Sequence, residues 1–139
     1  MRKKILAVPL LGGVALLSAG CKYNVVQTAV DAAAALQGAI VAAQTQYQPP
    51  CSTDPSAQPC LLINRAVAAQ NALVTATEAY CGFSTATAMT PTATCQPVST
   101  MQAGLTSALQ NANALFQEVS AAVDPATKAA LKSMPKGVK

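Results

Sequence analysis

The chain of 139 residues contains no histidine and no tryptophan, and only 10% of its residues are charged. Without histidine there is no imidazole for acid–base catalysis, for haem ligation or for a histidine-based zinc site. The acidic residues are scattered, with no two at a helical spacing that would pair them as catalytic carboxylates: Asp31, Asp54, Glu78, Glu118 and Asp124. We therefore expect no enzymatic activity, no metal and no other cofactor.

Positive charge is also scarce in the chain beyond its first few residues. The formal net charge of +4 comes from nine Lys and Arg against five Asp and Glu, but Arg2, Lys3 and Lys4 stand directly before an apolar run. Without those three, six bases face five acids, so we expect no nucleic-acid binding. Four of the six lie in the basic C-terminal segment 128–139, at Lys128, Lys132, Lys136 and Lys139. They are either a solvated tail that suits a helix C-terminus or a contact for an anionic envelope surface.

The N-terminal segment has the three parts of a secretory signal. A charged stretch, Met1 to Lys4, is followed by an apolar stretch, Ile5 to Leu17, and by small residues before Cys21. The apolar part is too short to span a bilayer comfortably, so residues 1–20 are expected to be cleaved. Residues 21–139 then form one small domain.

The sequence Leu17-Ser18-Ala19-Gly20-Cys21 resembles a bacterial lipobox, although Ser18 stands where such boxes more often carry leucine. The resemblance implies diacylglycerol on the Cys21 thiol, cleavage after Gly20 and acylation of the new amino terminus, typically with palmitate. An Asp at position 22 would resemble an inner-membrane retention signal in diderm bacteria. Lys22 therefore favours the outer membrane, facing the periplasm or the cell surface, or the plasma membrane of a monoderm. The alternative is an ordinary signal peptide that ends near a cysteine.

Beyond Cys21, three alanine-rich segments predict helices. In each, apolar residues recur at spacings of three and four, which places them on one stripe of a helix. The stripes are Val26, Ala29, Ala33, Leu36, Ile40, Ala43 and Tyr47; then Leu62, Ala66, Ala69, Leu73, Ala76 and Tyr80; then Met101, Leu105, Ala108, Ala112, Leu115, Val119 and Ala122. Second apolar lines are assigned to the core as well: Ile63, Val67 and Val74, and Leu109, Phe116 and Val123. The most apolar stretch, 32–43, is too short to cross a membrane.

Proline and glycine mark the expected limits of the first two helices. Pro49 and Pro50 are expected to end the first helix, because proline blocks its continuation. Pro59 is placed in the first turn of the second helix, and Gly82 is expected to end that helix in a left-handed conformation.

Polar residues mark the later helices. Ser99 and Gln102 have the spacing of a capping box for the third helix. Asp124 and Pro125 resemble an N-cap and a first-turn proline, which open a short helix that ends before Pro135. The predicted fold is all-α, a small antiparallel three-helix bundle with a short C-terminal helix.

Four cysteines remain after Cys21, an even number that favours disulfides in an exported chain. Cys60 and Cys81 bracket the second helix and are about 30 Å apart at roughly 1.5 Å per residue, whereas bonded cysteines have Cα atoms within about 7 Å. The helical arrangement therefore predicts Cys51 with Cys60 and Cys81 with Cys95, each bond closing one interhelical linker.

These observations favour a non-enzymatic envelope lipoprotein, anchored through Cys21, whose helices contact an envelope protein or a second copy of the chain. The first alternative is a ligand- or receptor-binding lipoprotein that uses the threonine-rich linker 84–94 and exposed helix faces, as phage-encoded exclusion lipoproteins do. An envelope enzyme is less favoured. So is covalent linkage to peptidoglycan through Lys139, which is similar to the terminal lysine of murein lipoprotein.

Overall fold

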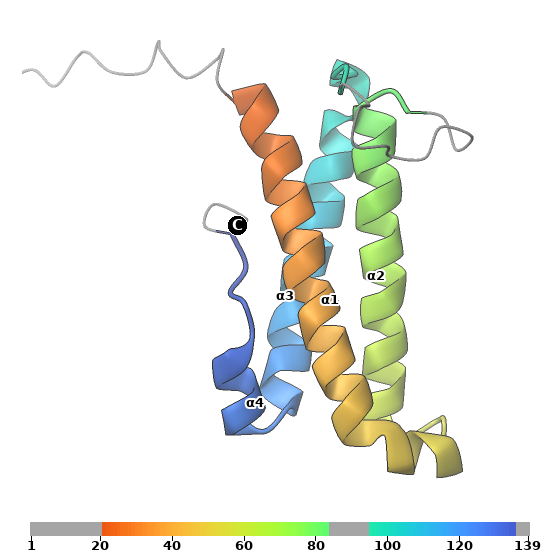
Figure 1. Ribbon diagram of the computed structural model, residues 1–139. Helices are drawn as coiled ribbons and strands as arrows, with labels where there is room; N and C mark the ends of the chain where they lie inside the picture. The colour runs from red at the N-terminus through yellow and green to blue at the C-terminus, as the bar shows by residue number, and fades with distance from the viewer. Residues whose placement is uncertain (1–20, 84–94, 136–139) are drawn as a thin grey trace, which may run out of the picture.

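The computed structural model describes residues 21–83 and 95–135, and within these residues all regular structure is helical. The elements are α1 (Cys21–Thr53), α2 (Gln58–Tyr80), the 3₁₀ turn η1 (Ser99–Met101), α3 (Gln102–Ala122) and α4 (Pro125–Ala130). Figure 1 shows α1, α2 and α3 side by side, with the short α4 at the end where α1 meets α2. The predicted all-α class is confirmed. The predicted signal 1–20, the linker 84–94, Lys136 and Lys139 lie outside the described residues.

Alanine dominates the part of the core that α1 contributes. The predicted stripe residues Ala29, Leu36, Ile40 and Ala43 are buried, and Ala33 and Tyr47 are half-buried. A second buried line, not predicted, is formed by Ala32, Ala35 and Ala39. It exists because α1 contacts both α2 and α3, so its buried face is wider than one stripe.

The predicted apolar residues of α2 and α3 are mostly buried or half-buried, with two exceptions, Met101 and Val74. Leu109, Phe116 and Val123 on the second line of α3 belong to the core. Met101, however, is 45% exposed, because it lies in the η1 turn before α3 begins. Val74 on α2 is 38% exposed, so the second line of α2 is buried only in part.

The prediction that Pro49 and Pro50 end the first helix is wrong. Both prolines lie inside α1, which continues to Thr53. Proline has a backbone φ compatible with a helix, and its missing N–H removes only the bonds to the Thr45 and Gln46 carbonyls one turn earlier. The helix continues beyond the pair, where the Asp54 N–H donates to the Pro50 carbonyl at 2.8 Å and the Ser52 hydroxyl adds a bond to the Gln48 carbonyl at 2.8 Å. The missing N–H groups still bend the helix, and Figure 1 shows the last part of α1 turned aside from the rest.

The predicted limits of α2 are confirmed. Pro59 lies in its first turn, and the helix ends at Tyr80. Gly82 follows with φ of +71°, a left-handed conformation that glycine adopts without strain. The Phe83 N–H donates to the Glu78 carbonyl and the Gly82 N–H to the Ala79 carbonyl, the bond pair of a Schellman motif.

Of the two predicted N-caps, one is wrong and one is confirmed. Ser99 lies inside the η1 turn, where its carbonyl accepts from the Gln102 N–H, and no side chain caps η1 or α3. The predicted capping box is therefore absent from these described residues. Asp124, by contrast, caps α4 and accepts hydrogen bonds from the N–H groups of Ala126 at 3.1 Å and Thr127 at 3.0 Å.

Candidate functional site

The cysteines pair as the sequence predicts. The Cα atoms of Cys51 and Cys60 lie 5.6 Å apart and those of Cys81 and Cys95 lie 4.4 Å apart, each pair with its sulfurs at bonding distance. Cys51 lies in the bent last part of α1 and Cys60 in the first turn of α2, so this bond joins the two helix ends. Each bond closes a connection between helices and leaves no thiol for redox chemistry at these positions.

The charged residues of the described chain form no cluster suited to catalysis or metal binding. No group of three or more His, Cys, Asp or Glu side chains in residues 21–83 and 95–135 could hold a metal ion. Arg65 on α2 and Glu118 on α3 form an ion pair at 3.3 Å, but both side chains are largely exposed. Such a pair contributes little to stability and is no reaction centre.

Hydrogen bonds lower the pKa of two exposed carboxyl groups. The hydroxyl and the backbone N–H of Ser56 hold the pKa of Asp54 below its ordinary value of 3.8. The hydroxyl and the N–H of Thr127, with the N–H of Ala126, do the same for Asp124. In each case the partners stabilise the ionised form, which is the role of a turn or cap residue and not of a general acid.

Cys21, the predicted lipidation site, is the first residue of α1. The basic C-terminal segment does not start near it. The Asp124 N–H donates to the Gln46 side chain at 3.0 Å, and the Tyr47 hydroxyl donates to the Ala122 carbonyl. These bonds hold the start of α4 about 38 Å along α1 from Cys21, at 1.5 Å per residue. The structure therefore separates Lys128, in the last turn of α4, from the predicted anchor.

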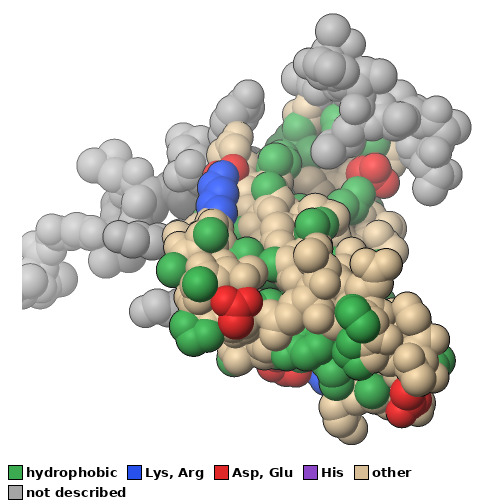
Figure 2. Space-filling view, turned by 60° about the horizontal axis from the view of Figure 1, so that its bottom comes forward, with side chains coloured by type: hydrophobic (Ala, Val, Ile, Leu, Met, Phe, Trp, Pro, Cys, Tyr) green, Lys and Arg blue, Asp and Glu red, His purple; other side chains and the backbone are tan. Residues whose placement is uncertain are grey.

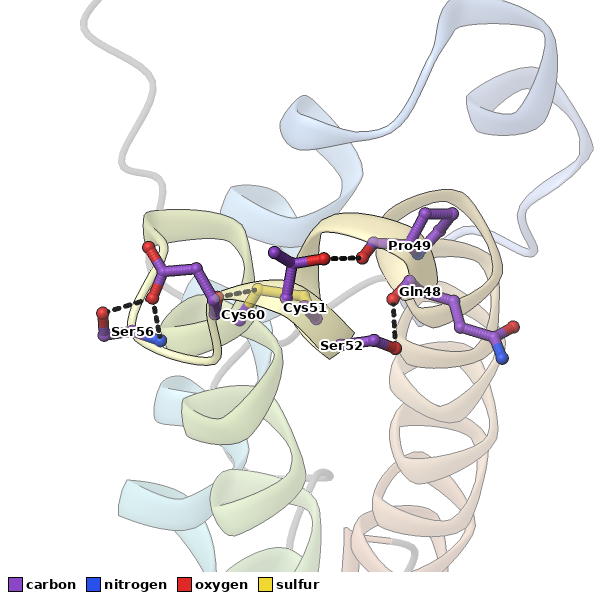
Figure 3. Close-up of a disulfide and its surroundings, with 8 residues drawn as sticks. Gln48, Pro49, Cys51, Ser52, Ser56 and Cys60 are labelled. Carbon is purple, nitrogen blue, oxygen red and sulfur yellow. Dashed lines mark hydrogen bonds between the residues drawn. A yellow bond between two sulfur atoms is a disulfide. The ribbon is translucent and has the colours of Figure 1, made fainter.

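A groove that the sequence did not predict lies where α1 meets α2. Its volume is about 440 Å³. Figure 2 shows this end of the molecule, on which charged side chains are few and separate, and Figure 3 shows the Cys51–Cys60 disulfide that joins its two sides. The lining residues come from both helices and from the turn between them: Val41, Gln44, Thr45, Gln48, Cys51, Ser52, Pro55, Cys60, Ile63 and Asn64.

The polar side chains of this groove fall into two kinds. The hydroxyls of Thr45 and Ser52 donate to carbonyls of their own helix, those of Val41 and Gln48. The carboxamides of Gln44, Gln48 and Asn64 are exposed and make no hydrogen bond to other described residues. Sequence reasoning had only one signal for this groove, the Pro-Pro-Cys run that bends α1, and it took that run as a helix end.

The hydropathy of α1 corrects a second expectation. Over Val25–Thr53 this helix is long and apolar enough to cross a membrane, with a mean hydropathy of 1.5, whereas the sequence reading found no such stretch beyond Cys21. Core helices of soluble proteins and signal sequences have the same length and composition. One face of α1 packs against α2 and α3, and 33% of its most apolar window is buried.

The described residues thus offer a neutral groove and two disulfide-closed helix connections, with an anchor point predicted at one end of α1. No protein family, curated protein or solved structure matches the chain.

Proposed function

We propose that the protein is a lipid-anchored envelope protein whose domain 21–139 is a structural or interaction module. The observation that carries this proposal is the lipobox-like sequence before Cys21, together with the position of Cys21 as the first residue of α1. Two or three acyl chains hold a protein on a bilayer stably, whereas one chain binds only marginally. The anchor lies in the outer membrane, because Lys22 stands where a retention aspartate would.

The domain in this proposal is an antiparallel three-helix bundle. Three links between helix ends support it. The Cys51–Cys60 bond joins the end of α1 to the start of α2, the Gln96 N–H donates to the Cys81 carbonyl near the start of α3, and Tyr47 on α1 bonds Ala122 at the end of α3. The colour in Figure 1 runs down α1, up α2 and down α3, in agreement with these links.

Replacing Cys21 tests the anchor. In cells of the source organism, Cys21→Ser should move the protein from the membrane fraction to the soluble fraction, because the attachment atom is gone. Tyr23→Ser is the matched control and should leave the protein in the membrane. If Cys21→Ser protein stays in the membrane and resists extraction at alkaline pH, an apolar segment of the chain holds it there, and the lipid-anchor proposal is wrong.

The groove favours one second candidate, a ligand- or receptor-binding lipoprotein. Its lining offers hydrogen-bonding groups without charge, which suits recognition of a neutral molecule. In this candidate the acyl anchor only localises the domain, and the activity is the binding itself. Both candidates share the anchor at Cys21 and differ in what the domain contacts.

A further inference from the structure

We infer that the groove between the last turns of α1 and the first turns of α2 binds an uncharged, extended peptide segment of another envelope protein. The inference deepens the proposed function, on which it rests for the location of the domain, by naming the contact surface and the chemistry of the partner.

The groove is concave because two features act on the same stretch of chain. Pro49 and Pro50 bend α1, so its last residues turn away from the axis of the preceding helix. The Cys51–Cys60 bond then fixes the bent part to the first turn of α2 (Figure 3). A covalent bond across the groove keeps its two sides at one separation, so little ordering remains to be done when a ligand binds.

The chemistry of the lining selects a neutral ligand. None of the ten lining residues carries a charge, so a phosphate, a carboxylate or a metal ion would enter without a counter-charge. A Gln or Asn carboxamide has two donors and an acceptor, which matches the N–H and C=O of a peptide unit. Gln44 and Asn64 offer such groups on opposite sides of the groove, and Gln48 stands at the rim with its carboxamide turned away from the disulfide (Figure 3).

The floor and the length of the groove fit a short segment. Val41, which is 48% exposed, and the exposed Pro55 present an apolar surface to a side chain of the ligand, whereas the lining residues Cys60 and Ile63 are almost fully buried. The lining on α1 runs from Val41 to Ser52, roughly 17 Å at 1.5 Å per residue. An extended peptide of about five residues covers that length at about 3.3 Å per residue. No aromatic side chain lines the groove to stack on a sugar or a base.

The groove also lies at a suitable distance from the predicted anchor. Gln44 is 23 residues along α1 from Cys21, which is roughly 35 Å of helix. A partner segment reaches this end without contact with the bilayer that holds Cys21.

Photocrosslinking in cells tests the inference with the full-length protein. A benzophenone-bearing amino acid replaces Val41, which lines the groove, or Ala34, which is exposed on α1 outside it. The Val41 position should form an adduct with another protein, and mass spectrometry should place the crosslink in a segment of about five residues without Asp, Glu, Lys or Arg. The Ala34 position should form this adduct at least tenfold less.

Variants that introduce charge at nearly constant side-chain size test the neutrality of the ligand. Gln44→Glu with Asn64→Asp keeps the size of both side chains and should reduce the Val41 adduct at least tenfold. Gln37→Glu with Asn71→Asp makes the same changes on exposed parts of α1 and α2 outside the groove and should leave the adduct unchanged. Circular dichroism of the purified variants checks that both pairs keep the helical fold.

Four results would overturn the inference: no adduct at Val41, a crosslink in a charged segment or a glycan, a crosslink to a second copy of this chain, or an adduct that survives Gln44→Glu with Asn64→Asp. Its failure is separate from that of the anchor. Release by Cys21→Ser without a Val41 adduct removes the groove proposal alone, and a Val41 adduct without release removes the anchor alone.

Discussion

The two ends of the helical bundle carry one disulfide each but are built differently. The closed end comprises Tyr80–Phe83 and Cys95–Val98, and the grooved end comprises Gln44–Thr53 and the chain up to Asn64. At the closed end Cys81 belongs to the hydrophobic core and Cys95 packs against it, and the N–H groups of Gln96 and Val98 bond the carbonyls of Cys81 and Tyr80. At the grooved end Cys60 is buried but lies outside that core cluster, and Cys51 is half-buried.

Buried hydroxyl groups repeat the contrast. Thr77, just before the closed end, donates its hydroxyl to the Leu73 carbonyl at 2.7 Å. Ser120, near the end of α3 that bonds Tyr47, is buried and its hydroxyl has no partner among the described residues. A disulfide thus joins two helix ends at both ends of the bundle. At the closed end it packs in the core, and at the grooved end it fixes the bent part of α1 to α2. The two prolines that break the local rule for helix interiors lie at the grooved end.

Removing each disulfide by double alanine replacement should have the largest effect on the free energy of unfolding, and it tests directly whether the two ends differ. Loop entropy alone gives about 3 kcal/mol for either bond, with a difference of about 0.4 kcal/mol between them. Cys81→Ala with Cys95→Ala should cost roughly 1 kcal/mol more than Cys51→Ala with Cys60→Ala, because it also leaves a cavity in the core. Urea denaturation measures both, and equal losses would show that the ends are built alike.

Alanine replacement of two glycines should change stability in opposite directions, at Gly82 in the closed end and at Gly38 in the middle of α1. Gly82→Ala should destabilise the closed end by about 1–2 kcal/mol, because an alanine at φ of +71° is strained and its Cβ would lie 3.4 Å from the Gln96 carbonyl oxygen. Gly38→Ala on α1 should stabilise the protein by roughly 0.5–1 kcal/mol, since nothing lies within 4 Å of the new Cβ. Thermal unfolding of both variants measures the difference, and a loss at both positions would contradict it.

The buried hydroxyls give the next effect. Ser120→Ala should stabilise the protein by about 1 kcal/mol, because it removes a buried polar group that lacks a partner. Thr77→Val should instead cost about 0.5–1 kcal/mol, because it removes a made hydrogen bond. Guanidinium denaturation compares the two variants, and a loss in Ser120→Ala would mean that this hydroxyl is satisfied in solution.

Acid should loosen the grooved end, with the smallest effect. Asp54 lies there, and the Asp124 N–H is bonded to it through the Gln46 side chain. Hydrogen bonds to the ionised forms of both carboxyl groups lower the pKa of each in the folded protein. Their contribution to stability is therefore complete above the ordinary pKa of 3.8 and is lost as the pH falls through the lower folded value. Amide shifts of Ser56 and Thr127, followed by NMR below pH 4, should report this loss.

Asp124→Asn is the control for that titration. Asparagine also caps a helix but carries no charge, so the Thr127 shift should lose its pH dependence while α4 stays formed. A Thr127 shift that still follows pH in this variant would assign the titration to another group.

The sequence predicted those features that depend on a few neighbouring residues. Local backbone rules correctly placed Pro59 in a first turn, Gly82 after a helix end and Asp124 at an N-cap. The length of the second helix was enough to select the cysteine pairs. Features that depend on the whole fold were missed. Pro49 and Pro50 remain helical because the Cys51–Cys60 bond and the carbonyl partners downstream hold that turn.

The groove could not be predicted for the same reason. It requires a bend in α1, a covalent link to α2 and carboxamides from both helices, and only the bend has a local sequence signal. For the capping box the local signal was present but the structure lacks the motif. Ser99 and Gln102 have the right spacing, but the chain enters α3 through a 3₁₀ turn. Local spacing is evidence only where the chain also enters the helix in the geometry that the motif requires.

The functional contrast between the ends depends on which end is anchored, and mass spectrometry of the N-terminal peptide from membrane-purified protein tests this most directly. The account predicts a mature chain that begins at Cys21, with diacylglycerol on its sulfur and an acyl chain on its amino group. A free Cys21 thiol, or a chain that retains residues 1–20, would contradict it.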